Sequence, residues 1–166
     1  MANPVWLDVA KNLIGVSEVP GPKNNPTIMG WIKRLGSKTL GISVVDEDTA
    51  WCGTFVTHCM VQAGITPPKV PVRASAWSTW GANLRADRLA PGAVLVFSRP
   101  GGGHVGFYVG EDDTTYFVLG GNQANAVNVS KIAKARCVAQ RWPTGVAVTG
   151  SPVRSTLKGS VSENEA

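Results

Sequence analysis

The order in which two kinds of hydrophobic spacing occur along the chain constrains the fold most strongly. Up to about residue 81, apolar residues recur at the three- and four-residue intervals of amphipathic helices. Beyond that point, short apolar runs are separated by glycine-containing turns, as in β-strands. Helices that come first and strands that come second favour an α+β fold with an antiparallel sheet over alternating β-α-β units. A chain of 166 residues has the size of one domain and can bury a core without disulfides or a structural metal.

The expected elements follow from this spacing and from the glycines and prolines that end it. Helices are expected over Pro4–Gly15, Pro26–Leu35, Cys52–Gly64 and Ala74–Gly81. Strands are expected over Ala93–Phe97, His104–Val109, Thr115–Leu119, Ala126–Val129 and Cys137–Trp142. The polar stretch Ser37–Ala50 predicts a long loop. Residues 1–143 would then form the domain, and residues 144–166, rich in Thr, Gly, Ser and Val, predict a flexible C-terminal tail.

A cysteine at the predicted start of the third helix is the first candidate for chemistry. Cys52 precedes the helically spaced apolar residues Phe55, Val56 and Cys59. A helix N-terminus stabilises a thiolate, because unpaired backbone N–H groups and the positive end of the helix dipole lie beside it. The same N–H groups can hold an oxyanion. The alternative interpretation is that Cys52 is a small buried hydrophobe, the common fate of a free cysteine.

A histidine at the start of a predicted strand is the candidate base. His104, one of only two histidines, follows three glycines and opens an apolar run. Histidine is the usual general base for a thiol, because its imidazole titrates near neutral pH. The alternative is that His104 only happens to begin a strand.

A third polar group should orient the imidazole, since a base must keep one tautomer and face the sulfur. If residues 104–109 and 115–119 form a hairpin, His104 and residues 119–122 lie near the same end of the sheet. Asn122 is therefore the expected orienting residue, with Gln123 as the substitute. The alternative is that both residues belong to a simple turn, a role that asparagine often fills.

Three segments together resemble the motifs of a known enzyme superfamily. They are Ala50-Trp-Cys-Gly-Thr-Phe-Val56, Gly102-Gly-His-Val-Gly-Phe-Tyr-Val-Gly110 and Val118-Leu-Gly-Gly-Asn-Gln123. In order and spacing they resemble the NlpC-like and CHAP (cysteine, histidine-dependent amidohydrolase/peptidase) superfamily of papain-like peptidoglycan hydrolases, especially members from bacteriophage and prophage lysis genes. The resemblance covers roughly residues 4 to 143.

This resemblance implies a papain-like α+β fold in which the nucleophile helix packs on a small antiparallel sheet that carries the base. It also implies hydrolysis of amide bonds in bacterial peptidoglycan without a cofactor. Carried over, Cys52 matches the nucleophile, His104 the base and Asn122 the third polar position. Many CHAP members have an acid at the position of Gly120, so Asn122 alone would fix the ring here and would stabilise the imidazolium less than a carboxylate.

Other residues near these motifs are candidates for contacts with a substrate or a metal. Trp51, Trp77, Trp80 and Gln123 are expected to line a substrate groove, because aromatic faces bind sugars and peptides, although core packing is the commoner fate of tryptophan. Some CHAP relatives bind calcium in an acidic loop before the nucleophile, where this chain has Asp46–Asp48. The spacing is not that of a full calcium loop, so a solvated loop or a helix cap is favoured and no metal site is expected.

The composition narrows the possible partners. Sixteen Lys and Arg against 11 Asp and Glu give a net charge of +5, which favours an anionic partner such as nucleic acid or a bacterial envelope. No nucleic-acid-binding motif accompanies this charge, so nucleic acid is not expected. No apolar run reaches the roughly 18 residues of a membrane span, and the first 15 residues lack the features of a signal peptide.

The sequence therefore predicts a monomeric, endolysin-like cysteine amidase or endopeptidase. It would be made in the host cytoplasm and reach the wall through a holin-type pore. One alternative keeps the chemistry but assigns it to an antibacterial amidase toxin or a virion-associated wall enzyme. The other is a catalytically inactive wall-binding or structural module of the same fold.

Overall fold

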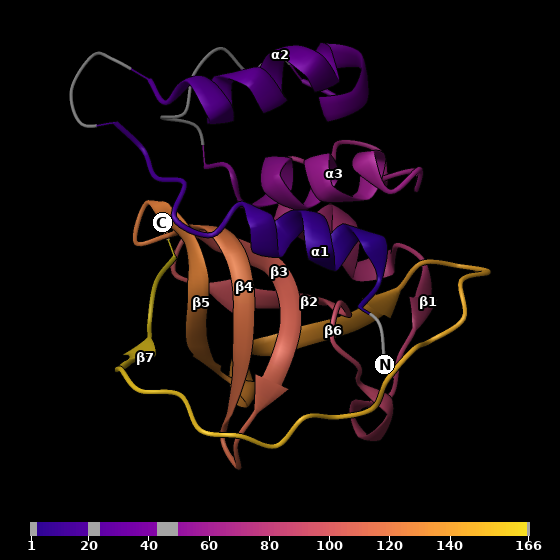
Figure 1. Ribbon diagram of the computed structural model, residues 1–166, viewed down its shortest axis with the longest axis vertical. Coiled ribbons are helices and arrows are strands. Elements are labelled where there is room, and N and C mark those ends of the chain that lie inside the picture. The colour runs from indigo at the N-terminus through magenta and orange to yellow at the C-terminus, as the bar shows by residue number, and fades with distance from the viewer. Residues whose placement is uncertain (1–2, 20–23, 43–49, 166) are drawn as a thin grey trace.

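The computed structural model describes residues 3–19, 24–42 and 50–165 and has an α+β architecture. Figure 1 shows the α-helices gathered above a curved sheet. The helices are α1 (Val5–Asn12), α2 (Pro26–Leu40) and α3 (Cys52–Gln62), with short 3₁₀ turns η1 (Ala74–Thr79), η2 (Ala86–Arg88) and η3 (Lys134–Arg136). The strands are β1 (Ala82–Asn83), β2 (Val94–Arg99), β3 (Gly102–Glu111), β4 (Thr115–Gln123), β5 (Ala126–Ala133), β6 (Cys137–Trp142) and β7 (Val161–Ser162). The predicted order of helices before strands is confirmed.

The described strands form one mixed sheet in the order β1-β6-β2-β3-β4-β5-β7. Every pairing is antiparallel except that of β5 with β7, which is parallel. The predicted hairpin between residues 104–109 and 115–119 is confirmed, because β3 and β4 pair with Phe107 opposite Leu119. His104 and the end of β4 therefore lie at the same end of the sheet.

Glycine conformation sets the ends of the second helix. The helical path breaks at Gly36, which has φ 70° and ψ 166°, at the place where the sequence predicts the helix to end. A further helical segment then runs to Leu40 and ends at Gly41, whose φ of 80° is left-handed. The predicted loop from Ser37 is therefore wrong for its first residues. At the other end, Asn25 Oδ1 accepts hydrogen bonds from Thr27 N and Ile28 N and caps the helix.

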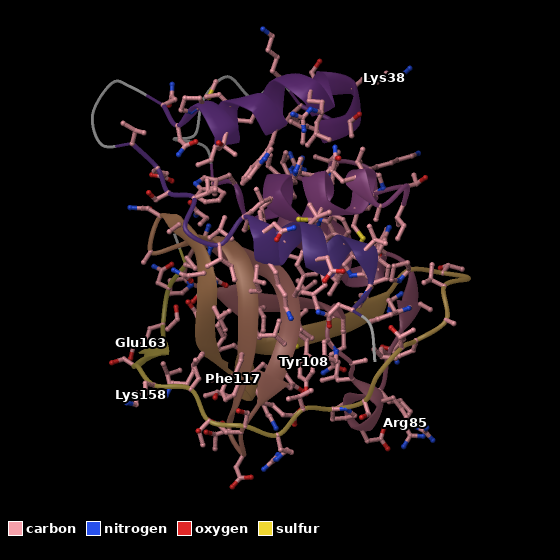
Figure 2. The ribbon with its side chains drawn as sticks, in the orientation of Figure 1. Lys38, Arg85, Tyr108, Phe117, Lys158 and Glu163 are labelled. Atoms are coloured by element: carbon pink, nitrogen blue, oxygen red, sulfur yellow. The ribbon has the colours of Figure 1, made fainter. Side chains whose placement is uncertain are left out.

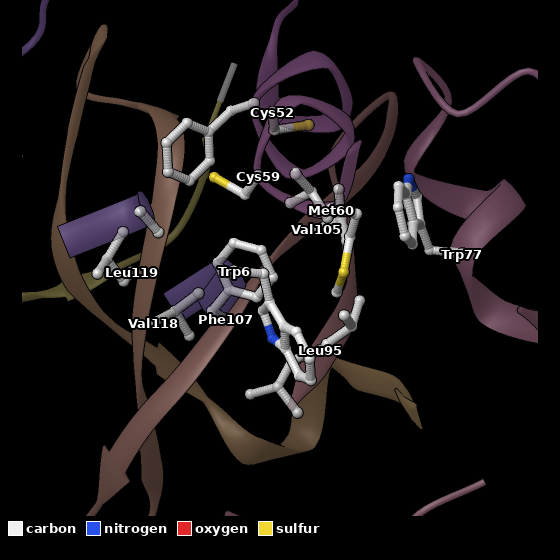
Figure 3. Close-up of a cluster of buried hydrophobic side chains, with 14 of the residues drawn as sticks. Trp6, Cys52, Cys59, Met60, Trp77, Leu95, Val105, Phe107, Val118 and Leu119 are labelled. Atoms are coloured by element: carbon white, nitrogen blue, oxygen red, sulfur yellow. The ribbon is translucent and has the colours of Figure 1, made fainter. Parts of the chain in front are cut away.

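The hydrophobic core lies between α3 and the sheet. Phe55 of α3 and Phe107 of β3 are fully buried, with ring centroids 6.2 Å apart. Figure 3 shows Cys59 and Met60 in this cluster, with Cys52 at its edge. Complete burial of side chains of this size contributes roughly 1.5–3 kcal/mol each. The start of α3 is thus held rigidly against β3 and β4.

The segment after residue 143, for which the sequence predicts a flexible tail, contacts the sheet at several points. It crosses the lower edge of the sheet in Figure 1, and Val153 N donates to Tyr108 Oη at 2.9 Å. Figure 2 shows Tyr108 beside this crossing, with Lys158 and Glu163 further along the same segment. The segment then pairs with β5 through β7, and Glu165 is only 1% exposed. Its polar composition gives no sign of these contacts.

Among the helices that the structure describes, none has both the length and the apolar character needed to cross a bilayer.

Candidate active site

The nucleophile candidate occupies the predicted position, since Cys52 is the first residue of α3. Its side chain is 4% exposed. The following residue must be glycine, because a Cβ on Gly53 would lie 2.3 Å from Pro71 O and 2.7 Å from Val72 O. This close approach of two backbones fixes the start of the helix. The first N–H groups of α3 lack intrahelical partners, as at every helix start, and lie beside the sulfur.

The base candidate is fully buried on β3 and interacts with the sulfur. Burial by itself would raise the pKa of the Cys52 thiol, but the proximity and positive charge of His104, with the backbone N–H groups of Val105 and Gly53, hold that pKa below its ordinary value. Burial would likewise lower the pKa of His104, but the Cys52 sulfur, Gln123 and the negative charge of Glu165 raise it. Both directions favour a thiolate–imidazolium pair.

The hydrogen bonds of Gln123 fix the tautomer of His104. Gln123 Nε2 donates to Val118 O, Asn128 O and Asn128 Oδ1, so its Oε1 must be the atom that faces the imidazole. Oε1 lies 3.0 Å from His104 Nε2 and, as an acceptor, requires that Nε2 carries the proton and donates the hydrogen bond. This leaves Nδ1 for Cys52. Nδ1 is buried and has no partner of standard hydrogen-bond geometry among the described residues, so its interaction with the sulfur departs from that geometry.

The expectation that Asn122 orients the base is wrong on geometry. Asn122 Nδ2 donates to Glu165 O at 3.0 Å, and the described hydrogen bonds include none between Asn122 and His104. Gln123, the expected substitute and groove residue, makes the contact instead. It is 2% exposed and belongs to the buried site rather than to a groove wall.

A β-bulge is the physical reason for this exchange. Continued at the register of Phe107 opposite Leu119, the hairpin would place Asn122 opposite His104, with both side chains on one face. Between the pairs Gly120–Asn128 and Gln123–Ala126, however, β4 has two residues and β5 has one. Asn122 takes the extra place in a left-handed conformation with φ 60°. Gln123 is thereby moved to the face that carries His104.

The missing side chain at Gly120 provides the space for this arrangement. A Cβ on Gly120 would lie 2.7 Å from Gln123 Oε1 and 3.4 Å from His104 Nε2. An acid at this position would compete with the Gln123 amide for the same side of the ring. The glycine before the bulge is thus the sequence signal that could have identified Gln123.

A buried ion pair lies behind the orienting residues and was not expected from the sequence. Glu165 bonds Arg136 Nη2 through Oε1 at 2.6 Å and accepts a hydrogen bond from Ser162 Oγ at 2.5 Å. Burial would raise the pKa of the Glu165 carboxyl, but Arg136, Ser162 and the charge of His104 lower it. The carboxylate therefore stays ionised near the imidazolium that it helps to stabilise.

A cavity of about 450 Å³ opens beside Cys52 and could admit a substrate. Its walls include Phe97 of β2, Gly103 of β3, and the segment before η1. Two arginines, Arg73 and Arg99, also line it. No tryptophan belongs to this wall among the described residues.

The expected tryptophan groove is therefore wrong for these three residues. Trp51 is 1% exposed and donates to Glu18 Oε1 at 2.6 Å, and Trp77 is fully buried and donates to Pro71 O at 2.9 Å. Trp80 is half-buried, donates to Thr66 O and lines a separate cavity. All three indoles satisfy their N–H groups within the protein and serve the packing around the site.

Asp46–Asp48, the candidate calcium ligands, lie outside the described residues. Within the described ranges, no cluster of three or more His, Cys, Asp or Glu side chains could hold a metal ion.

Comparison of the sequence with models of known protein families finds no matching family, and comparison with curated proteins finds no match. A thiol at a helix N-terminus, a base with one nitrogen toward the sulfur, and an amide that fixes the other nitrogen together form the arrangement that nucleophilic catalysis by cysteine requires.

Proposed function

We propose that this chain is a cysteine hydrolase of the papain-like NlpC/CHAP type that cleaves amide bonds in the peptides of bacterial peptidoglycan. The observation that carries the proposal is the buried contact of Cys52 with His104, whose other ring nitrogen is held by Gln123 at 3.0 Å. An ordinary buried cysteine would have a raised pKa, as Cys59 has, whereas the pKa of Cys52 is lowered. This difference favours a reactive thiol over a packing residue.

The proposed reaction proceeds through an acyl-enzyme. The Cys52 thiolate attacks the carbonyl carbon of the amide, and the unpaired backbone N–H groups at the start of α3 hold the oxyanion. His104 gives the proton on Nδ1 to the leaving amine as the C–N bond breaks. Water then attacks the thioester while Nδ1 accepts its proton. The acid is released, and the thiolate–imidazolium pair is restored.

Peptidoglycan is proposed as the substrate because of the three motifs that resemble the NlpC-like and CHAP superfamily. The net charge of +5 supports an anionic polymer as the partner. The lysis part of the proposal, which comprises synthesis in a bacterial host cytoplasm and access to the wall through a holin-type pore, rests on the motif resemblance alone.

Digestion of purified peptidoglycan tests the proposal directly. The released fragments, identified by mass spectrometry, should carry one new amine and one new carboxyl group at the cleaved bond. Cys52→Ala should lower their release by at least about 10³-fold, since the nucleophile is removed. Cys137→Ser is the matched control, because its half-buried thiol lies on β6 outside the cavity wall, and it should retain cleavage. Full cleavage by folded Cys52→Ala would refute the mechanism.

A further inference from the structure

The cavity beside Cys52 has an uneven distribution of charge. Its described lining residues include Arg73 and Arg99 and no acidic side chain. The other lining residues are small, apolar or hydroxyl-bearing, such as Ala74, Ser75 and Phe97. A ligand that enters this cavity therefore meets two positive charges near the nucleophile, with no neighbouring carboxylate among the described lining residues to compensate them.

Arg99 is held in place by the backbone of the β2–β3 hairpin. Its Nε donates to Gly103 O at 2.9 Å, and its Nη1 donates to Pro100 O at 3.2 Å. Gly103 directly precedes His104 in the chain, so the guanidinium is anchored next to the base. Because the side chain is already held in place, less conformational entropy is lost when a ligand binds it.

One side of this guanidinium is left open by a glycine. A Cβ on Gly102 would lie 3.6 Å from Arg99 Nη2 and 3.7 Å from Cζ, which is ordinary contact distance. Any other residue would therefore cover this part of the guanidinium with its side chain. The described residues give Arg99 Nη2 no hydrogen-bond acceptor, so its N–H groups are available to a ligand.

Arg73 lines the same cavity from the segment before η1. It directly precedes η1, its side chain is exposed, and it has no ion pair within the described part of the chain. The two walls meet close by, because a Cβ on Gly103 would lie 3.3 Å from Ala74 Cβ. The two guanidinium groups thus belong to a single opening.

We propose that this opening is a carboxylate-binding subsite, in which Arg99 binds and Arg73 reinforces a carboxylate of the substrate close to the scissile amide. Arginine suits this role because its planar N–H groups match a carboxylate and stay charged at all working pH values. The inference rests on the proposed function and narrows it to acidic peptides.

Two alkylating reagents test the subsite without any peptide substrate. Iodoacetate carries a carboxylate and iodoacetamide is its neutral analogue, and each transfers its CH₂ carbon to the Cys52 sulfur as iodide leaves. The ratio of the iodoacetate rate to the iodoacetamide rate at Cys52 should exceed the ratio for glutathione by about tenfold, which corresponds to about 1.4 kcal/mol and lies near the lower end of what a hydrogen bond to a charged group contributes. Arg99→Gln should lower this ratio most of the way towards that of glutathione, because only the reinforcing charge of Arg73 then remains.

Arg85→Gln is the matched control, because Arg85 is exposed, pairs with Asp87 and does not line the cavity. It should keep the high ratio. A low ratio in the unmodified protein, or a ratio that Arg99→Gln leaves unchanged, would refute the subsite.

Peptide pairs then test the proposal on the reaction itself. Matched peptides whose carboxylate next to the scissile bond is free or converted to a carboxamide should differ in kcat/KM by about ten- to a hundredfold in favour of the acid. Arg99→Gln and Arg73→Gln should each reduce this ratio, mainly through KM. Equal reduction for acid and carboxamide would refute the subsite. Failure to cleave either peptide, with the alkylation ratio still high, would refute peptide hydrolysis and leave the anion site standing.

Discussion

Replacing Gln123 with leucine removes the hydrogen bond that orients the proposed base and nearly conserves the volume of the side chain. In the native site Gln123 Oε1 lies 3.0 Å from His104 Nε2, and both residues are buried. A hydrogen bond to a charged group contributes about 1.5–3 kcal/mol. Since about 1.4 kcal/mol corresponds to a factor of ten, kcat/KM should fall about 10- to 150-fold.

The same substitution should change the pH dependence of Cys52 in a defined direction. The pKa of His104 is raised and that of Cys52 is lowered, so the ion pair exists between the two. Without the Gln123 acceptor the imidazolium is less stable, the pKa of His104 falls, and the pKa of Cys52 rises because it loses part of that positive charge. The window in which Cys52 reacts as a thiolate therefore narrows from both sides.

The assay is the rate of iodoacetamide alkylation at Cys52 between pH 4 and 9, with thermal unfolding as the check on folding. Asn122→Gly is the matched control, because glycine tolerates the φ of 60° at this position and the lost amide contacts Glu165 O rather than the imidazole. It should change the rate by less than about threefold, an effect below 1 kcal/mol. The reasoning fails if folded Gln123→Leu keeps the native profile, or if Asn122→Gly causes the larger loss.

Three further outcomes can be measured on the same protein. At pH 6 about 0.3% of an ordinary thiol is ionised, and burial raises the pKa of Cys137 to about 11. Iodoacetamide should therefore label Cys52 at least about tenfold faster than Cys137 at this pH, and equal labelling rates would contradict the ion pair. Gly121→Ala places a Cβ 2.7 Å from a tryptophan ring atom and should lower the unfolding free energy, measured in urea, by about 1–3 kcal/mol. Gly30→Ala, whose Cβ would have nothing within 4 Å, should not destabilise the protein, and equal effects of the two substitutions would show that the contact at Gly121 is not tight. Burial, with a nearby arginine, lowers the pKa of His58 to about 4. As the pH falls from 6.5 towards 4, only the unfolded chain gains this proton, so the protein loses about 2–3 kcal/mol of its unfolding free energy. His58→Phe should lose less unfolding free energy than the native protein between pH 7.5 and 4.5, and identical losses would refute the assignment.

Short-range patterns in the sequence predict much of the fold. The spacing of Phe55, Val56 and Cys59 identifies α3 and puts Cys52 at its first residue. The bounds of β6 agree with the expected Cys137–Trp142. The start of α3 and the bounds of β6 depend on residues only a few positions apart in the chain, and a single sequence shows such spacing directly.

Features that depend on distant segments are not visible in the same way. The three tryptophans expected in a groove are packed or bonded inside the protein, because residue type alone does not reveal which face of an element is covered. The burial of Glu165 depends on Arg136 from η3, and polar composition hides such a pairing. Arg73 and Arg99 share one cavity only because η1 and the β2–β3 hairpin meet in space.

The bulge in β4 also affects how related chains should be aligned. Loss of one residue between Gly120 and Gln123 would restore the regular pairing and place the glutamine two residues after Gly120 instead of three, still opposite Ala126. A chain one residue shorter could therefore carry its orienting amide one position earlier while keeping the same geometry around the ring. In chains that share this hairpin, the orienting residue should accordingly be identified by its hydrogen bond to the histidine rather than by its column in an alignment.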